Sequence, residues 1–376
     1  MGPHVAKRNA TTAPGEARTL TASGRSERRA DHRGKPMTAP EPLLAVRDLR
    51  VRFPAERGVV KAADGVSFQV GEGEVVAVVG ESGSGKTVTA LSILRLLPRS
   101  ARVTGEVTFR GTSLLDLPDD RIRSLRGSKI AMVFQDALAA LNPLHRVGHQ
   151  VEEAIRLHHR DVSHKEARAR VVELLGSVGI PNPGDRYSEY PHQFSGGMRQ
   201  RAMIAMAIAN DPDLLIADEP TTALDVTTQA QVLEVLAEAR ERTRSAMVLI
   251  SHDLGVVAGV ADRVVVMYAG RVVETGTVRQ VFHNPEHPYT AGLLGSLPRL
   301  DQRGGRHLTR IPGQPPSLVD VPPGCPFHPR CPVARVPEPC ASDRPELRST
   351  SAPEHLAACH FAGATAATVA AEHGRS

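Results

Sequence analysis

Short apolar runs alternate with amphipathic stretches along most of this chain. Alternating apolar residues begin within TAPEPLLAVRDLRVRF (38–53) and return in VSFQV (66–70), as in strands with one buried face. The run EVVAVVG (74–80) is almost wholly apolar, which is typical of a strand buried on both faces of a sheet. A helix is predicted directly after it, over residues 86–97.

Toward the C-terminus, the apolar pattern predicts a helical region followed by more strands. Residues from about 120 to 200 have helical periodicity, with HQVEEAIRLHH and KEARARVVELLGSVGI both amphipathic. The later elements are a buried strand DLLIAD (213–218), a helix over 227–242, and strands AMVLIS (246–251) and RVVVMYAG (263–270). This alternation predicts an α/β fold.

The two ends of the chain differ from this middle part. Residues 1–40 are rich in Arg, Ser, Thr, Ala and Pro and lack apolar periodicity, so we expect a disordered basic arm. Met1 and Met37 both remain candidates for the true start. After about residue 285 prolines become frequent and the regular patterns fade. We therefore predict an arm (1–40), a main domain (41–285) and a C-terminal appendage (286–376).

Charge and apolar content exclude several classes of protein. The formal net charge is +5, and residues 1–36 hold eight Lys and Arg against three Asp and Glu, which accounts for all of the excess. A neutral remainder gives no support to a nucleic-acid-binding surface. No run approaches the roughly 18 apolar residues that cross a bilayer, and the N-terminus lacks the apolar centre of a secretion signal. We expect a cytoplasmic chain.

The clearest chemical motif is GESGSGKT (80–87), which matches G-x-x-x-x-G-K-[ST] in full between a buried strand and a helix. Its glycines let successive N–H groups and the helix N-terminus converge on phosphate oxygens. Lys86 would bind the β- and γ-phosphates, and Thr87 would offer a hydroxyl to Mg²⁺. The predicted nucleotide-binding residues here are Gly80, Glu81, Ser82, Gly83, Ser84, Gly85, Lys86 and Thr87.

A second motif, LLIADEP, places Asp218 and Glu219 at the carboxyl end of an apolar strand. Ligands of α/β sheets bind at this edge. Asp218 would organise Mg²⁺ through water, and Glu219 would polarise the water that attacks the γ-phosphate.

A longer stretch that includes the second motif resembles the signature, second strand motif and D-loop of the ATP-binding cassette (ABC) family. It covers residues 192–225, HQFSGGMRQRAMIAMAIANDPDLLIADEPTTALD. FSGG stands where many members have LSGG, and Met198 replaces a common Gln. The resemblance implies a P-loop NTPase with a RecA-like core, an antiparallel β subdomain and a helical subdomain inserted at about 120–200. It also implies a head-to-tail dimer in which Ser195, Gly196 and Gly197 of one chain contact the γ-phosphate of ATP bound by the other.

The resemblance assigns roles to four more positions. Gln135 in MVFQD is similar to the Q-loop glutamine that reaches Mg²⁺ and the attacking water, and His252 in LISHDL to the switch histidine that contacts the γ-phosphate. Asp225 resembles the D-loop aspartate that couples the two sites, and Phe53 is the candidate for stacking on adenine. Because every catalytic position is occupied, we expect a subunit that hydrolyses ATP.

Three classes of protein share such a cassette: transporters, DNA-repair or chromosome-maintenance proteins, and ribosome-associated factors. Repair and chromosome members split the cassette with long heptad segments, but only about 60 residues separate Gln135 from Ser195. Ribosome-associated members carry two cassettes on one chain, and this chain has one. The pattern favours transport.

The C-terminal segments NPEHPYTAGLLGSLPRLD (284–301), IPGQPPSL (311–318) and GCPFHPRCP (324–332) resemble the extension of dipeptide, oligopeptide and nickel permease ATPases. Those are importers, so the resemblance implies two transmembrane permease subunits, an extracytoplasmic substrate-binding protein, and a peripheral position at the cytoplasmic face of the membrane. FSGGMRQR is more similar to the D-type subunit than to its F-type partner, which implies a heterodimer. Peptide, nickel and another small solute all remain open as cargo.

All four cysteines lie in the last 52 residues, with the spacing C-x5-C-x8-C-x18-C: Cys325, Cys331, Cys340 and Cys359. In a reducing compartment such grouping favours metal ligation over disulfides. Four thiolates suit tetrahedral Zn²⁺ or a cubane cluster, and unligated thiols are the third alternative. The resemblance implies a [4Fe–4S] cluster, because some members of the family hold one with such a set.

Overall fold

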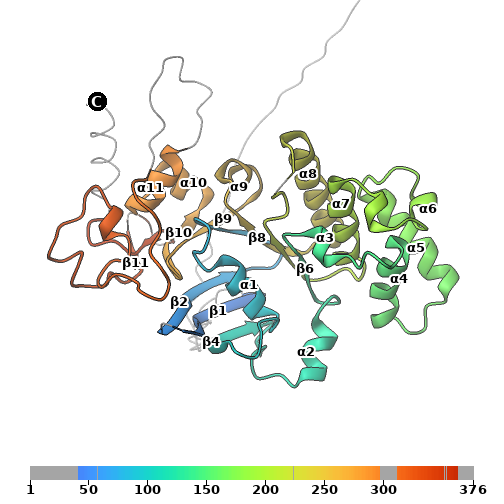
Figure 1. Cartoon of the computed structure of the whole chain (residues 1–376), viewed down its shortest axis with the longest axis horizontal. Helices are drawn as coiled ribbons and strands as arrows, with labels where there is room; N and C mark the ends of the chain where they lie inside the picture. Colours follow the sequence, from blue (N-terminus) through green and yellow to red (C-terminus); the bar gives the residue numbers. More distant parts are fainter. Residues whose placement is uncertain are drawn as a thin grey trace, which may run out of the picture. The chain divides into compact units, whose positions relative to one another are not determined.

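The computed structural model describes residues 41–56, 58–222, 224–296, 311–350, 352 and 354–362 (Figure 1). All of them fall within one compact unit, Pro40–Ser376. The expected disordered arm and the choice between Met1 and Met37 lie outside the described residues. Within those ranges, none of the helices has both the length and the apolar character that crossing a membrane requires.

A large sheet of eight strands forms the centre of this unit, in the order β11-β12-β10-β9-β3-β8-β7-β6. Its five parallel strands are β3 (Val75–Val79), β6 (Ile130–Val133), β7 (Leu214–Asp218), β8 (Ala246–Ser251) and β9 (Arg263–Tyr268). The antiparallel strands are β10 (Arg271–Thr277), β11 (Arg348–Ser349) and β12 (Leu356–Ala357). Every residue of β3, β7 and β8 is buried, as the apolar runs before Asp218 of β7 and Ser251 of β8 and throughout β3 predict.

Residues of β7 alternate between two cores on opposite faces of this sheet. Leu214 and Ile216 join a core with α1 (Lys86–Ile93), whereas Leu215 and Ala217 join another with α8 (Val226–Thr243). In Figure 1, α1 lies on one side of the sheet, and α8 and α9 (Leu254–Val260) lie on the other. The period-two alternation of strand side chains is the reason that one strand supplies both cores.

A smaller antiparallel sheet covers α1 in the order β2-β1-β4-β5. Its strands are β1 (Leu44–Ala55), β2 (Gly58–Val70), β4 (Arg102–Phe109) and β5 (Thr112–Ser113). Leu44 and Val66 share a core with Ile93 of α1 and Val76 of the large sheet. The helix that follows the phosphate loop is therefore held between the two sheets.

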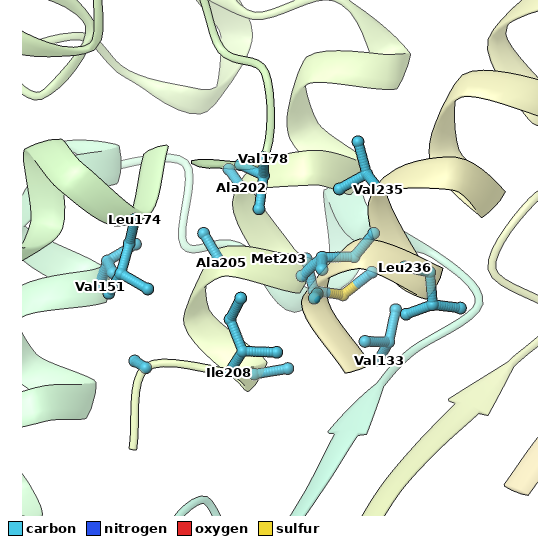
Figure 2. Close-up of a cluster of buried hydrophobic side chains, with 14 of the residues drawn as sticks. Val133, Val151, Leu174, Val178, Ala202, Met203, Ala205, Ile208, Val235 and Leu236 are labelled. Carbon is cyan, nitrogen blue, oxygen red and sulfur yellow. The ribbon is translucent and has the colours of Figure 1, made fainter. Parts of the chain in front are cut away.

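The helical part is built from α3 (Ala137–Ala140), α4 (Val147–His158), α5 (His164–Ser177), α6 (Pro183–Arg186), the 3-10 turn η1 (Pro191–Gln193) and α7 (Gly196–Ala207). Ser163 and Glu166 form a capping box that starts α5. Figure 2 shows Met203 of α7 close to Leu236 of α8, with Val133 of β6 beside them, and all three belong to one core. The helices therefore share their core with the large sheet.

The helical range expected over about 120–200 is wrong at one place. It contains α2 (Asp119–Leu125) and then β6 (Ile130–Val133), which is the edge strand of the large sheet beside β7. A buried run of four apolar residues has no period that separates strand from helix. Its pairing with β7 decides the conformation, and helix α7 also continues past residue 200 to Ala207.

The C-terminal segment, expected as an appendage, instead adds strands and side chains to the main unit. Strand β12 pairs with β10 and β11 with β12, which extends the large sheet. Helix α10 (Val278–His283) precedes this segment, and α11 (Pro288–Gly295) is its first helix. Phe327 packs against Tyr268 and Tyr289, with ring centroids 5.3 and 5.4 Å away. A few large side chains are enough to pack this proline-rich segment, because they join a core already present in the main domain.

A buried carboxylate ties these parts together. Glu274 of β10 is fully buried and accepts hydrogen bonds from the backbone N–H groups of Glu286 and His287 and interacts with His355 Nε2 at 2.7 Å. Burial lowers the pKa of His287 to about 3, so its imidazole is neutral and its Nδ1 accepts from Tyr289 N–H, starting α11. Buried polar groups are satisfied here by residues far apart in sequence.

Candidate active site

The loop that starts at Gly80 connects β3 to α1, where the sequence predicts it, and Lys86 and Thr87 are the first residues of α1. Gly80 has φ 151°, and a Cβ there would lie 2.2 Å from the carbonyl oxygen of Met267. At Gly85, with φ 100°, a Cβ would lie 2.1 Å from the carbonyl oxygen of Ala62. Only glycine fits either position, because the neighbouring contacts are to backbone that cannot move aside.

The Lys86 side chain is folded back into its own loop. It is 4% exposed, and its Nζ donates to the carbonyl oxygens of Gly80 and Glu81 at 2.8 and 3.1 Å. Burial lowers the pKa of Lys86, and the carboxylates of Glu219, Asp218 and Glu81 oppose that shift. The ammonium group is therefore positioned inside a concave loop with carboxylates near it.

Asp218 and Thr87 meet at the carboxyl end of β7. Thr87 Oγ1 donates to Asp218 Oδ1 at 3.1 Å, and burial raises the pKa of Asp218. Nearby in the loop, Ser84 Oγ is buried without a hydrogen-bond partner among the described residues. Hydroxyl and carboxylate oxygens are the ligands that Mg²⁺ prefers, so this pair fits the predicted metal role.

Glu219 adopts a backbone conformation that is uncommon for a residue with a side chain. Its φ is 45°, in the left-handed region, while its N–H still donates to the carbonyl oxygen of Ile250 on β8 at 2.9 Å. Strained residues of this kind cluster at functional sites, where the surrounding structure holds them in place. The twist turns the side chain of Glu219 off the line of the strand.

The Glu219 carboxylate is the point at which four other side chains meet. Oε2 accepts from Gln135 Nε2 at 3.3 Å and from Thr222 Oγ1 at 2.9 Å, and it lies 3.3 Å from His252 Nδ1. Oε1 lies 3.7 Å from Lys86 Nζ. Gln135 and His252, predicted separately, are thus brought together here. Thr222 was not predicted, although a hydroxyl three residues after the glutamate in DEPTT is a sequence signal for it.

The signature residues do not join this cluster. Ser195 is exposed and caps α7, with its Oγ accepting from Met198 N–H at 3.3 Å. Gly196 is exposed as well, whereas Gly197 is buried, and a Cβ there would lie 2.5 Å from Cγ2 of Thr228. Small residues thus leave the start of α7 open, and the predicted contact with a second chain's nucleotide stays a prediction.

Two further predicted residues occupy structural positions. Asp225 caps α8, accepting from Thr228 N–H at 3.0 Å and Thr228 Oγ1 at 2.7 Å, and these hydrogen bonds lower its pKa. Phe53 lies on β1, partly buried against the core between the sheets. Its stacking on adenine and the coupling role of Asp225 remain predictions. Ser82 is exposed in the loop.

The four cysteines are thiols that lie close enough to influence one another. Burial, with a smaller contribution from the neighbouring cysteine thiolates, raises the pKa of Cys325 to about 11 and that of Cys331 to about 12. Cys325 N–H donates to the carbonyl oxygen of Cys340 at 2.9 Å. In the described part of the chain, however, no three His, Cys, Asp or Glu side chains form a group that could hold a metal ion. The structure gives no support to the predicted cysteine metal site.

Two residues of the C-terminal part that the sequence did not single out contact the phosphate loop. Tyr289 Oη accepts from Glu81 N–H at 2.8 Å. Arg330 forms an ion pair with the Glu81 carboxylate at 2.7 Å. Neither contact has a local sequence signal, because both join segments about 200 or more residues apart.

Comparison with known proteins places these features in context. Residues 63–222 match the family described as ABC transporter, and residues 273–340 match the family described as oligopeptide/dipeptide transporter, C-terminal region. The chain is 55% identical to the dipeptide transport ATP-binding protein DppD of Bacillus subtilis over 294 residues, covering 78% of this chain and 87% of that one. It is 49% identical to the oligopeptide transport ATP-binding protein OppD of Salmonella typhimurium over 324 residues, covering 85% and 95%.

Other relatives differ more in length or sequence. The OppD protein of Mycobacterium tuberculosis is 54% identical over 318 residues, which is 85% of this chain, but the chain spans only about half, 52%, of that relative. Among solved structures, the dimeric ATP-binding cassette MJ0796 in a post-hydrolysis state bound to ADP and Pi aligns with a TM-score of 0.57 at 29% identity. The alignment covers 63% of this chain and 99% of that one.

Proposed function

This chain belongs to the family of ATP-binding subunits of oligopeptide and dipeptide ABC transporters, and from that membership we propose that it hydrolyses MgATP to drive peptide import through a membrane permease. The observation that carries the proposal is the Glu219 carboxylate, which lies within 3.7 Å of Lys86 Nζ and within 3.3 Å of Gln135 and His252. Glu219 has a strained backbone, and its carboxylate lies among a lysine, an amide and an imidazole. This arrangement suits chemistry on a phosphate group.

Each residue has a task in that reaction. The loop N–H groups and the Lys86 ammonium bind the phosphates, and Lys86 can release the carbonyls of Gly80 and Glu81 to do so. Thr87, Asp218 and Gln135 would hold Mg²⁺, which when bound neutralises charge on the β- and γ-phosphates.

The proton chemistry is assigned to Glu219. Its carboxylate orients the attacking water and accepts a proton from it, while His252 and Thr222 hold the carboxylate in place. Lys86 Nζ lies 3.7 Å from the other carboxylate oxygen, which places a positive charge beside the proposed base.

A second chain completes the site in this proposal. Ser195 and Gly196 are exposed at the start of α7, and Ser195 Oγ bonds within its own helix start, so this end is open to a partner's γ-phosphate. The resemblance of FSGGMRQR to D-type subunits favours an F-type ATPase as that partner. Two permease subunits and a substrate-binding protein complete the importer, with this chain peripheral at the cytoplasmic face of the membrane.

Transport in vesicles tests the cargo and the coupling. The chain is combined with an F-type ATPase, two permease subunits and a substrate-binding protein, and ATP hydrolysis and uptake are measured with a peptide or with Ni²⁺. We expect a peptide to stimulate hydrolysis and to accumulate, since relatives named for oligopeptides and dipeptides support that cargo. Uptake of Ni²⁺ alone would reassign the cargo, and the absence of MgATP hydrolysis would reject the proposal.

We also propose that Cys325, Cys331, Cys340 and Cys359 bind a [4Fe–4S] cluster. The support is the family resemblance, the influence of neighbouring cysteines on the pKa values of Cys325 and Cys331, and the Cys325 to Cys340 backbone hydrogen bond. Against it, the described side chains do not converge as metal ligands.

Metal analysis of anaerobically purified chain decides between the alternatives. The proposal expects about four irons and four acid-labile sulfides per chain, with absorption near 400 nm. Both should be lost in Cys331→Ser. One zinc per chain would instead indicate a redox-inert tetrahedral site, and chain without iron or zinc would return the cysteines to unligated thiols.

A further inference from the structure

The phosphate loop is held from outside by the C-terminal part of the chain, and both contacts fall on Glu81. Tyr289 of α11 accepts a hydrogen bond from Glu81 N–H at 2.8 Å. Arg330 is the last residue of the 3-10 turn η2 (His328–Arg330), and it bonds both carboxylate oxygens of Glu81, from Nη1 at 2.7 Å and from Nη2 at 3.0 Å. This two-point pairing is the strong, directional form of an arginine–carboxylate interaction.

Arg330 is itself anchored in the C-terminal segment. Its side chain is 6% exposed, and Nε donates to the carbonyl oxygen of Pro312 at 2.8 Å. Nη1 also lies 3.3 Å from Tyr268 Oη, whose ring the guanidinium covers at 5.8 Å. Because these partners fix the guanidinium of Arg330, its hydrogen bonds to Glu81 fix the position of the Glu81 carboxylate.

Glu81 also contacts Lys86, the lysine proposed to bind the nucleotide phosphates. The carbonyl oxygen of Glu81 accepts from Lys86 Nζ at 3.1 Å and from Ser84 N–H at 3.2 Å. Tyr289 fixes the nitrogen of the same residue, and Arg330 fixes its side chain. One residue therefore connects the C-terminal segment to the turn that cradles the phosphates.

Charge gives the Arg330 contact a second consequence. Glu81 is a carboxylate in a loop that must receive a polyphosphate, and it is only 26% exposed, so water screens it incompletely. The guanidinium of Arg330 neutralises it in place. Without Arg330, an unpaired negative charge would remain on a residue of the loop that receives the phosphates.

We propose that Arg330 is a positioning residue for nucleotide binding, which holds Glu81 and cancels its charge so that the phosphate loop can accept MgATP. The C-terminal segment then acts as part of the nucleotide site of its own chain, in addition to any role in the transporter. This inference rests on the proposed function, because it presumes that the loop binds ATP.

A double-mutant cycle in the full-length chain tests it, with MgATP affinity measured by equilibrium titration. Arg330→Ala is expected to weaken MgATP binding by about tenfold or more, because it leaves a part-buried carboxylate unpaired. Adding Glu81→Gln to Arg330→Ala should restore affinity to within about threefold of Glu81→Gln alone, since no charge then needs cancelling. Arg348→Ala, which removes an exposed arginine paired with Glu346 on the same segment, is the control and should change affinity less than about twofold.

The outcomes separate the possible failures. If Arg330→Ala binds MgATP as well as the wild-type chain, or if Arg330→Ala and Arg330→Ala/Glu81→Gln are equally weak, Arg330 does not act through the charge of Glu81 and the inference is wrong. Melting temperatures identify a variant that fails to fold. If Arg330→Ala fails to fold, Arg330→Lys replaces it in the cycle. Lysine keeps the charge but not the two-point pairing, so an intermediate loss of MgATP affinity is expected. A wild-type chain that binds no MgATP would reject the proposed function and this inference together.

Discussion

Replacing Glu219 by Gln is expected to reduce ATP turnover by about 100-fold or more while leaving MgATP binding largely intact. Glutamine has the shape of glutamate and can still meet Thr222 and His252, but it cannot accept a proton from water, and positioned bases typically contribute 10² to 10⁴ in rate. The structure sharpens this expectation because the carboxylate is already held by four side chains.

The measurement is phosphate release at saturating MgATP, with binding titrated separately and the oligomeric state followed by gel filtration. If the composite dimer is correct, Glu219→Gln with MgATP should accumulate as a closed dimer, since hydrolysis no longer opens it. Glu238→Gln, an exposed glutamate on α8, is the matched control and should hydrolyse ATP at the wild-type rate. Unaltered hydrolysis in Glu219→Gln would remove Glu219 as the base.

Replacing Lys86 by Ala is expected to act at an earlier step, weakening MgATP binding by about 100-fold or more. The ammonium group is buried among Glu219, Asp218 and the loop carbonyls, so its loss removes the phosphate ligand and also leaves buried carboxylates uncompensated, a change that typically costs about 3 to 5 kcal/mol. The anionic nucleotide would then enter a site of net negative charge.

Equilibrium titration with a fluorescent ATP analogue in the presence of Mg²⁺ measures this effect. Lys129→Ala is the control. Lys129 is half-exposed, it pairs with Asp213 at 3.8 Å, and neither residue belongs to the loop from Gly80 to Thr87. Its affinity should match that of the wild-type chain. An unchanged affinity in Lys86→Ala would show that the loop from Gly80 to Thr87 is not the phosphate site. A cooperative melting transition above the temperature of the titration would exclude general unfolding as the cause of any loss.

Both predictions concern residues that local sequence identifies, whereas the interaction of the C-terminal segment with the loop has no such signal. Arg330 stands among prolines and cysteines, a setting that favours an extended linker, and Tyr289 belongs to a short HPYT segment. Their contacts with Glu81 arise because Phe327, Tyr268 and Tyr289 pack together and carry the segment over the phosphate loop. Hydrophobic packing between distant segments is non-directional and leaves little trace in a local pattern.

Local sequence is enough to predict the parts of this protein that depend on neighbouring residues. An all-apolar run predicts β3, three glycines with a lysine predict the turn and start of α1, and an apolar run before Asp218 predicts β7. Backbone geometry and burial act over a few residues, so these features are visible one stretch at a time. The four-residue strand β6 was missed because so short a run carries no period.

Which of these parts come into contact depends on the complete fold. Gln135 follows β6, Glu219 follows β7 and His252 follows β8, and these strands are neighbours in the large sheet, so their carboxyl ends bring the three side chains together. Strand order is set by the burial of two whole faces of the sheet, a property of the complete fold rather than of any segment. The same long-range packing placed Arg330 on Glu81 and joined a proline-rich C-terminal segment to the nucleotide site.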